Sequence, residues 1–433
     1  MDVIVGGGIV GLSIAWRLAR RGREVVVVDP SPATGASYAA AGMLAPISEV
    51  TYTEEPLLRL GAASLRRWPA FAAALAADAG LTPSAATGFR ADEQAGDLAG
   101  AAFAGLDGSG DGAHGQPAAR TGADGQTGAT FTGLGDAGEA AQWLAAARAG
   151  LDLREDGTLD VAFGSDDLAM LDEQARFMEK LGLPVERLTG RECRRLEPML
   201  APSVRGGLLA RTDAWVDPRR VTAALLAALD RLGVPVVRAR VRELLRDGGR
   251  VVGVRLAPPE PATATLAAER VVLAAGAWSG ELAEVPVRPV KGQIMRLRSP
   301  QPLLGRCVRG SVHGTPVYLV PRGDGELVVG ATQEELGFDT RVTAGGVYEL
   351  LRDARELVPG VTELEVADVV AGLRPGTPDN LPVIGPSGTP GLLLATGHHR
   401  GGVLLAPLTA AILEGEETGL ATLCSPARFR DVS

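Results

Sequence analysis

The sequence predicts an α/β protein in which a Rossmann-like nucleotide-binding domain is built from both chain ends and carries an inserted α+β domain. Three observations predict this arrangement. The first 29 residues have the pattern strand, glycine-rich turn, helix, strand. Residues 234–330 consist of short β-rich runs separated by Gly and Pro, which is typical of a mainly antiparallel sheet. The last third of the chain again alternates between helical and strand-like segments.

Length, charge and cysteine content limit the class of protein. A chain of 433 residues can bury the core of two or three domains. Lys and Arg number 43 against 52 Asp and Glu, and the formal charge of -9 would repel a polyanion, so we expect no nucleic-acid partner. Cys193, Cys307 and Cys424 lie far apart without paired spacing, which predicts neither disulfides nor a metal site. A reducing, cytoplasmic location is the simplest interpretation.

No segment has the features of a membrane span or of a secretory signal. The apolar runs are short and are broken by Arg, Asp and Gly, so we expect no contact with a membrane. The N-terminus begins directly with an apolar strand and has no basic region before it.

Composition and local patterns divide the chain into four parts. Residues 91–155 contain few large apolar side chains and are rich in Gly and Ala, so they are expected to form a flexible insertion. We expect residues 1–90 to form the N-terminal part of the nucleotide-binding domain. Residues 156–335 are expected to form mainly a substrate domain, in which the chain returns to the first domain near 206–280. Residues 336–433 are expected to form the C-terminal part of the nucleotide-binding domain, with a loop that contacts the cofactor.

Helix-start signals place several elements. Thr189 and Glu192 have the spacing of a capping box. Asp217 and Pro218 predict the start of a helix that continues to Leu232, with Asp as the N-cap and Pro in the first helical position. Further helices are expected at 54–79, at 343–357 and from about Gly401, and further strands at 366–373 and 392–394.

The motif Gly6-Gly7-Gly8-Ile9-Val10-Gly11 fits the G-x-G-x-x-G pattern between a strand and a helix. Its glycines permit the tight turn, the close approach of a pyrophosphate and close helix packing, and the helix N-terminus favours negative charge. Asp29 ends the next strand, where a carboxylate can accept both ribose hydroxyls and would repel a 2′-phosphate. The motif therefore favours FAD or NAD over NADP, although a glycine-rich segment can also be a simple tight turn.

A second glycine-rich segment, Gly397-His398-His399-Arg400-Gly401-Gly402-Val403, precedes an apolar helix near the other chain end. The free backbone N–H groups at that helix start can face an anion. A reduced flavin is anionic at its N1/O2 edge, and the helix dipole would contribute roughly 0.3 to 2 kcal/mol toward it. Alone, such a segment can equally be a structural helix start. Next to the first motif it favours FAD over NAD.

The chain resembles the D-amino-acid oxidase superfamily of FAD enzymes, and within it the glycine oxidases of thiamine biosynthesis. The resemblance covers nearly the whole chain apart from the insertion. It is carried by Ala39 to Leu44, Tyr318 to Arg322, Ala371 to Thr377, and Gly397 to Arg400 leading into Val403 to Pro407, with further matches at Val272 to Ser279 and Pro289 to Gly292.

The resemblance implies non-covalently bound FAD. It places Ala41, Gly42 and Met43 along the isoalloxazine ring, Ser37 near the phosphates or the ribityl chain, and Val241 near the adenine. The full set of expected FAD contacts is Gly6, Gly8, Ile9, Val10, Gly11, Asp29, Pro30, Ser37, Ala41, Gly42, Met43, Val241, His398, His399, Arg400, Gly401, Gly402, Val403 and Leu404. At His398 and His399 the backbone, rather than the imidazole, is expected to meet the flavin.

Arg374, Tyr318 and Arg400 are the predicted catalytic residues. A guanidinium can bind a planar carboxylate through two parallel charge-assisted hydrogen bonds and stays charged at all relevant pH values. The resemblance assigns this role to Arg374, with Tyr318 as a second donor and Arg400 near the substrate or the flavin edge. Without the resemblance, Arg374 could form an interdomain salt bridge and Tyr318 could be a core aromatic. Lys291 is expected to be exposed in a turn, and Pro316 replaces a histidine that some relatives carry.

The implied activity is oxidation of the amine of glycine, with sarcosine or small D-amino acids as further substrates. The products would be the imine or glyoxylate and hydrogen peroxide, with dioxygen as the electron acceptor, and the imine would supply thiazole synthesis. The resemblance also implies a homo-oligomer. The alternatives are a sarcosine oxidase, a D-amino-acid dehydrogenase that reduces a quinone, or a flavoprotein domain without free turnover. No cysteine lies in the flavin motifs, which argues against a covalently linked flavin.

Overall fold

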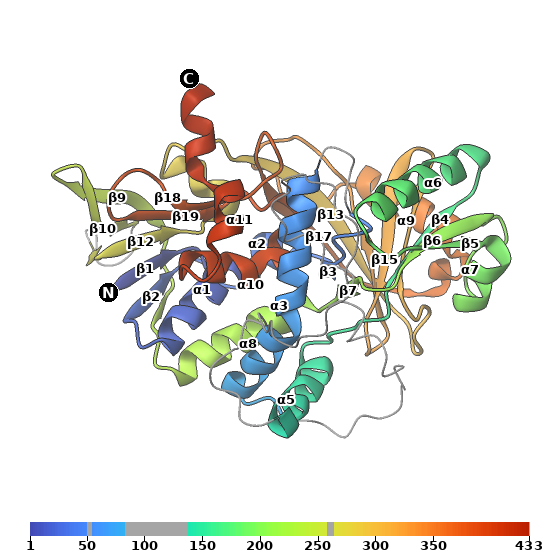
Figure 1. Cartoon of the computed structure of the whole chain (residues 1–433), viewed down its shortest axis with the longest axis horizontal. Helices are drawn as coiled ribbons and strands as arrows, with labels where there is room; N and C mark the ends of the chain where they lie inside the picture. Colours follow the sequence, from blue (N-terminus) through green and yellow to red (C-terminus); the bar gives the residue numbers. More distant parts are fainter. Residues whose placement is uncertain (50–53, 83–136, 258–263, 433) are drawn as a thin grey trace, which may run out of the picture.

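The computed structural model describes residues 1–49, 54–82, 137–257 and 264–432. In this part of the chain a six-stranded and an eight-stranded sheet lie side by side, on the left and right of Figure 1 respectively. Both chain ends lie on the side of the six-stranded sheet (Figure 1). No helix among these residues is long and apolar enough to cross a membrane.

The six-stranded sheet joins strands from the start, the middle and the end of the chain. In spatial order its strands are β18 (Val383–Pro386), β19 (Leu392–Thr396), β12 (Arg270–Leu273), β1 (Asp2–Val5), β2 (Val25–Val28) and β8 (Val236–Val237). All neighbouring pairs are parallel except β18 and β19. This Rossmann-like sheet, formed from both chain ends, confirms the predicted fold class.

Both faces of this sheet are covered, as its nearly uninterrupted apolar strands require. Ile4 and Val27 belong to the core cluster beneath the helices, whereas their neighbours Val3 and Val26 belong to the cluster on the opposite face. The helical layer contains α1 (Ile9–Arg20), α3 (Glu55–Ala79), α8 (Pro218–Arg231) and α10 (Gly402–Leu413). The opposite face is covered by an antiparallel sheet of β9 (Val241–Asp247), β10 (Arg250–Leu256) and β11 (Thr265–Ala267).

The eight-stranded sheet is antiparallel except where β14 pairs with β4. Its spatial order is β17 (Glu365–Gly376), β13 (Arg288–Arg298), β16 (Glu326–Gly330), β15 (Thr315–Pro321), β14 (Cys307–Val312), β4 (Thr158–Ala162), β6 (Gly206–Ala210) and β5 (Glu186–Thr189). Helix α9 (Ala344–Leu357) packs on it through Leu350, Ala354 and Leu357. The sheet confirms the predicted inserted α+β domain.

Shorter elements connect the two halves and extend their edges. They are α2 (Gly35–Ala39), β3 (Met43–Leu44), α5 (Ala137–Gly150), α6 (Ser165–Lys180), α7 (Gly190–Leu196), β7 (Ala214–Trp215), η1 (Gly276–Glu281), η2 (Pro359–Glu363), η3 (His399–Gly401), α11 (Thr418–Ala421), η4 (Thr422–Cys424) and η5 (Pro426–Val432). Strands β3 and β7 pair with each other and bring the segment after α2 against the start of α8.

The predicted helix caps are present. Thr189 Oγ1 accepts a hydrogen bond from Glu192 N at 3.3 Å, and the Glu192 carboxylate accepts one from Thr189 N at 2.8 Å, which confirms the capping box. Asp217 accepts a hydrogen bond from Arg219 N at 2.9 Å, and Pro218 is the first residue of α8. These local signals were sufficient because each depends on residues within one helical turn.

The predicted domain boundaries need three corrections. Residues 137–155 are not a loose insertion, because Ala146, Ala147 and Leu151 are buried in the core against α3; residues 83–136 lie outside the described part of the chain. Strand β6, at 206–210, belongs to the eight-stranded sheet, so the return to the first domain begins at α8. Strand β17, at 365–376, also belongs to the eight-stranded sheet, and helix α9, at 344–357, packs on that sheet. Periodicity predicts a strand but not its pairing partner, which is set by contacts far apart in sequence.

Asp2 anchors the middle of the six-stranded sheet. Its buried carboxylate accepts two hydrogen bonds from Arg23 at 2.9 Å and two from Arg270 at 2.9 and 2.7 Å. Burial disfavours the charged form, but the hydrogen bonds from Arg270 and Arg23 outweigh it and hold the pKa of Asp2 below its ordinary value. Asp2 thereby joins β1, the turn before β2, and the start of β12.

We expect Asp2→Asn to lower the free energy of unfolding by about 3 kcal/mol at neutral pH, because it leaves two guanidinium groups without their carboxylate. Since the folded-state pKa is depressed, the contribution of Asp2 is present above its unfolded pKa of about 3.9 and is lost as pH falls below it. Urea unfolding at pH 7 and at pH 3 measures both effects, with exposed Glu24→Gln as the control. A difference between wild type and Asp2→Asn that does not shrink in acid would contradict this assignment.

Candidate functional site

A cavity of about 720 Å³ lies where the two sheets meet. Its walls come from the β1–α1 turn, from α2 and β3, from the β12–η1 junction, from β15 and β17, and from η3 and the start of α10. Gly8, from one chain end, and Gly402, from the other, both line this cavity together with Arg374. The two glycine-rich motifs of the sequence therefore meet in one place.

Most of the predicted site residues line the cavity. They are Gly6, Gly8, Ile9, Val10, Asp29, Pro30, Ser37, Ala41, Gly42, Met43, Val241, Tyr318, Arg374, His398, His399, Arg400, Gly402 and Val403.

Gly11, Gly401 and Leu404, the other expected FAD contacts, are not among the residues that line the cavity. A Cβ on Gly11 would overlap the carbonyl oxygen of Gly6, so this glycine serves helix packing. Gly401 is buried and donates to the carbonyl of His398 at 2.8 Å. The Leu404 carbonyl accepts hydrogen bonds from Ser64 and Trp68 of α3, so it faces away from the cavity.

The β1–α1 turn is shaped to receive a negatively charged group. Gly6 has a φ of 116°, which an L side chain rarely adopts. The first-turn N–H groups of α1 have no acceptor within their own helix, and that of Ile9 donates to Ser37 Oγ at 2.9 Å. Asp29 accepts hydrogen bonds from Gly7 N and Ser31 N, both at 2.7 Å. Since a carboxylate has about four lone-pair sites, Asp29 keeps acceptor capacity toward the cavity.

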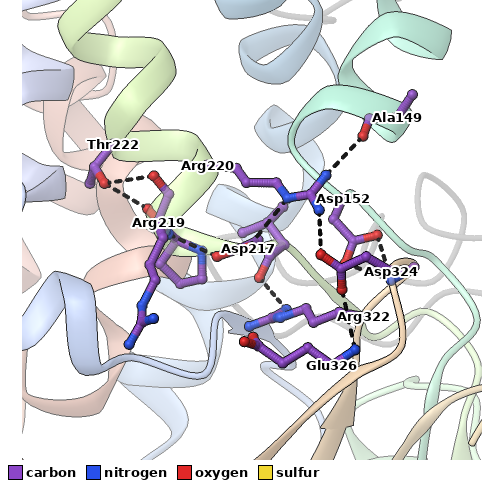
Figure 2. Close-up of polar contacts among 12 residues, drawn as sticks. Ala149, Asp152, Asp217, Arg219, Arg220, Thr222, Arg322, Asp324 and Glu326 are labelled. Carbon is purple, nitrogen blue, oxygen red and sulfur yellow. Dashed lines mark hydrogen bonds and ion pairs between the residues drawn. The ribbon is translucent and has the colours of Figure 1, made fainter. Parts of the chain in front are cut away.

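The segment after α2 is held in place by a buried arginine. Arg322, directly after β15, is 2% exposed and donates to the carbonyls of Ala41 and Val216. Figure 2 shows Arg322 pointing toward the start of α8, beside Asp217. Gly42 has a φ of 82°, and a Cβ there would overlap the carbonyl of Val216. These contacts fix the wall formed by Ala41, Gly42 and Met43.

The C-terminal wall of the cavity contains two neutral histidines. His398 is buried, its Nε2 lies 2.9 Å from Thr409 Oγ1, and burial lowers its pKa to about 4. Burial, with Arg400 and Arg374 nearby, also lowers the pKa of His399 to about 4. Arg400 donates to Glu54 and to the Glu49 carbonyl. Arg400 is therefore the paired cation of this wall, and neither imidazole carries charge at neutral pH.

Arg374 on β17 and Tyr318 on β15 are separated by β13 and β16 in the eight-stranded sheet, and both side chains line the cavity. The Arg374 guanidinium donates to the carbonyls of Lys291 at 3.4 Å and Thr332 at 3.2 Å, and no carboxylate of the described residues pairs with it. Burial raises the pKa of Tyr318 to about 12, so its hydroxyl stays protonated. A Cβ on Gly292 would overlap the Arg374 guanidinium, and one on Gly330 would overlap the Tyr318 ring. These two strand glycines create the space that the functional side chains fill.

A model of the family described as "FAD dependent oxidoreductase" (DAO) matches residues 3–108 and 117–414. The chain belongs to this FAD-dependent oxidoreductase family.

Two curated relatives and one solved structure extend the match. A bifunctional ThiO/ThiG protein of Trichormus variabilis is 32% identical over 95% of this chain and 51% of its own length, so the chain spans about half of that relative. A glycine oxidase of Geobacillus kaustophilus is 30% identical over 96% of this chain and 93% of its own. The crystal structure of glycine oxidase from Geobacillus kaustophilus superposes with a TM-score of 0.75, covering 99% of this chain and 98% of that one at 30% identity.

The residues around the cavity fit the cofactor of this FAD-dependent family. The glycine turn and the start of α1 would hold the pyrophosphate, Asp29 the ribose, and Val241 with its neighbours the adenine. The wall from Ala41 to Met43 and the start of α10 would face the flavin ring. None of the three cysteines lines the cavity, so no thiol is available there for a covalent link.

The sequence-based interpretation was wrong for Lys291 and did not include Glu49 or Arg309. Lys291 is fully buried within β13 rather than exposed in a turn, and its Nζ lies 3.2 Å from Glu334, a partner that the local sequence does not reveal. Glu49 and Arg309 both line the cavity, yet neither lies in a recognisable motif. Gly292 and Gly330 did carry a signal, because a glycine inside a strand often marks a close approach of another group.

We expect Gly11→Ala to lower FAD affinity by at least about 100-fold, or about 2.7 kcal/mol, because the added methyl would push α1 away from the Gly6 carbonyl. Flavin content per polypeptide and the dissociation constant for FAD added to apoprotein measure the effect. Gly345→Ala in α9 is the matched control, since a Cβ there meets nothing within 4 Å. Full flavin occupancy and unchanged affinity in Gly11→Ala would show that close packing at this turn is not needed.

Proposed function

We propose that this protein oxidises the amine of glycine, with dioxygen as the electron acceptor. The observation that carries the proposal is the guanidinium of Arg374, which lines the cavity beside Tyr318 without a carboxylate partner among the described residues. A cationic fork that is not neutralised by the protein is suited to a carboxylate supplied by the substrate. The names of the two relatives, a ThiO/ThiG protein and a glycine oxidase, support the same substrate class.

The side chains of this chain would bind and orient the substrate. Arg374 would donate two parallel hydrogen bonds to the substrate carboxylate, and the protonated Tyr318 hydroxyl would donate a third. Pro316 lines the same cavity, and its side chain offers no group that could give or take a proton. When bound, FAD supplies the acceptor for the two electrons and the hydrogen that leave the substrate α-carbon. The contribution of the protein is therefore position and electrostatics rather than a nucleophile.

The overall reaction would be glycine, dioxygen and water giving glyoxylate, ammonia and hydrogen peroxide. The first product, an imine, would either hydrolyse or be used in thiazole assembly for thiamine biosynthesis. The name of the ThiO/ThiG relative supports the second fate. We further propose a homo-oligomer, on the basis of the family resemblance, and a cytoplasmic location, because all three cysteines are free and buried.

Sarcosine and small D-amino acids are the alternative substrates, because they present the same carboxylate beside an amine. A panel of glycine, sarcosine and D-alanine separates them by oxygen consumption, and a quinone acceptor in the same assay distinguishes a dehydrogenase from an oxidase. Anaerobic loss of flavin absorbance on mixing with each amine tests for turnover directly. A flavoprotein that no small amine reduces would have no oxidase function of this kind.

We expect Arg374→Ala to lower kcat/KM for glycine by roughly 2 to 5 kcal/mol, between about 30-fold and several thousand-fold, because the substrate carboxylate would lose its partner. Arg374→Lys should recover only part of the loss, since an ammonium lacks the planar fork. Steady-state oxygen consumption measures both variants. Arg341→Ala is the control, because that side chain is 86% exposed. Normal efficiency in Arg374→Ala would overturn the proposed role.

A further inference from the structure

Glu49 is an acidic side chain in the cavity whose carboxylate accepts no hydrogen bond from any residue that the structure describes. It lies at the end of the segment that follows β3, and it lines the same cavity as Tyr318 and Arg374. The side chain is half-buried. A carboxylate in such a place needs a donor, and a bound substrate can supply one.

The backbone that carries Glu49 is fixed from two sides. Asp213 is fully buried and accepts hydrogen bonds from Ile47 N at 3.3 Å, Ser48 N at 3.1 Å and Ser48 Oγ at 2.5 Å. Arg400 donates to the Glu49 carbonyl at 2.9 Å. Glu49 is therefore held at the cavity wall by Asp213, in the turn between β6 and β7, and by Arg400 of η3.

Most charges around Glu49 already have partners. Arg309 on β14 lies 3.4 Å from Asp160 on β4, and Arg400 pairs with Glu54. Tyr318 on β15 and Cys307 on β14 stay neutral, because burial raises the pKa of both groups. Arg374 donates only to carbonyls.

The cavity thus presents one guanidinium without a carboxylate partner and one carboxylate without a hydrogen-bond donor among the described residues. This matches a small zwitterion, with the substrate carboxylate on Arg374 and the ammonium on Glu49. Burial raises the pKa of Glu49, while Arg309, Arg400 and Arg374 oppose that rise and Asp160 adds to it. A raised pKa brings a carboxyl group closer to the pH at which it can accept and release a proton.

We propose that Glu49 binds the ammonium of the substrate and accepts one of its protons, an inference that rests on the proposed amine oxidation. An N–H bond of the ammonium breaks, an O–H bond forms on the Glu49 carboxylate, and the nitrogen keeps the electron pair. The neutral amine can then use that pair to form the carbon–nitrogen double bond when the α-hydrogen leaves. Glu49 returns its proton to water when the product departs.

The first test compares the pH profiles of kcat/KM for glycine in wild type, Glu49→Gln and Glu49→Asp. At neutral pH Glu49→Gln should be roughly 100-fold less efficient, and the deficit should shrink as pH rises and the amine loses its proton to solvent. Glu49→Asp keeps a carboxylate and should retain the profile of the wild type. The matched control is Glu186→Gln on the far edge strand β5, where the side chain is 45% exposed. A deficit in Glu49→Gln that is equal at all pH values overturns the proposal.

The second test uses binding alone. Calorimetry compares acetate, which has only the carboxylate, with 2-aminoisobutyrate, which adds the ammonium but has no hydrogen on its α-carbon. Glu49→Gln should bind acetate as wild type does and 2-aminoisobutyrate about 10-fold more weakly, the loss expected for one charge-assisted hydrogen bond. Equal binding of 2-aminoisobutyrate by both proteins overturns the proposal. Neither ligand is oxidised, so this measurement does not depend on turnover. A wild type that oxidises no glycine would refute the proposed function, whereas the calorimetry would still show whether Glu49 binds the ammonium.

Discussion

The arrangement of the site depends on the buried guanidinium of Arg322. This residue directly follows β15 of the eight-stranded sheet and donates to the carbonyls of Ala41 and Val216 on the nucleotide-binding side. Burial lowers the pKa of Arg322, so the protein holds this charge at an energetic cost that its hydrogen bonds must offset. The contact places the strand that carries Tyr318 at a fixed distance from the wall that would face the flavin.

Small residues then determine how closely the other groups approach. Gly11 lets α1 pack against the Gly6 carbonyl, and Gly42 lets the segment after α2 pass under Val216. In the other sheet, Gly292 and Gly330 leave the volumes that Arg374 and Tyr318 occupy. On the cofactor side, the missing Cβ lets two backbone segments pack closely. On the substrate side, it lets a side chain pack against the backbone of a strand.

Of the cavity arginines Arg309, Arg374 and Arg400, two are paired with carboxylates, and the third pairs with no carboxylate of the described residues. Arg400 has Glu54 and Arg309 has Asp160, whereas Arg374 has only carbonyl partners. The two histidines of the C-terminal wall are neutral, so they add no cation that would compete for the substrate carboxylate. In a site of low polarity each remaining charge has a large influence, and this pattern favours a ligand with one acid and one basic group.

The sequence by itself determined those features of the protein that depend on residues close together in the chain or on motifs in a fixed order. The unit from Asp2 to Asp29, the capping box at Thr189 and the FAD-dependent family were all readable from local patterns. Only the tertiary structure decided that β17 pairs with β13, that Lys291 is buried, and that Glu49 shares a cavity with Arg374. The physical reason is that strand pairing and burial are set by contacts between residues far apart along the chain, and no local pattern records them.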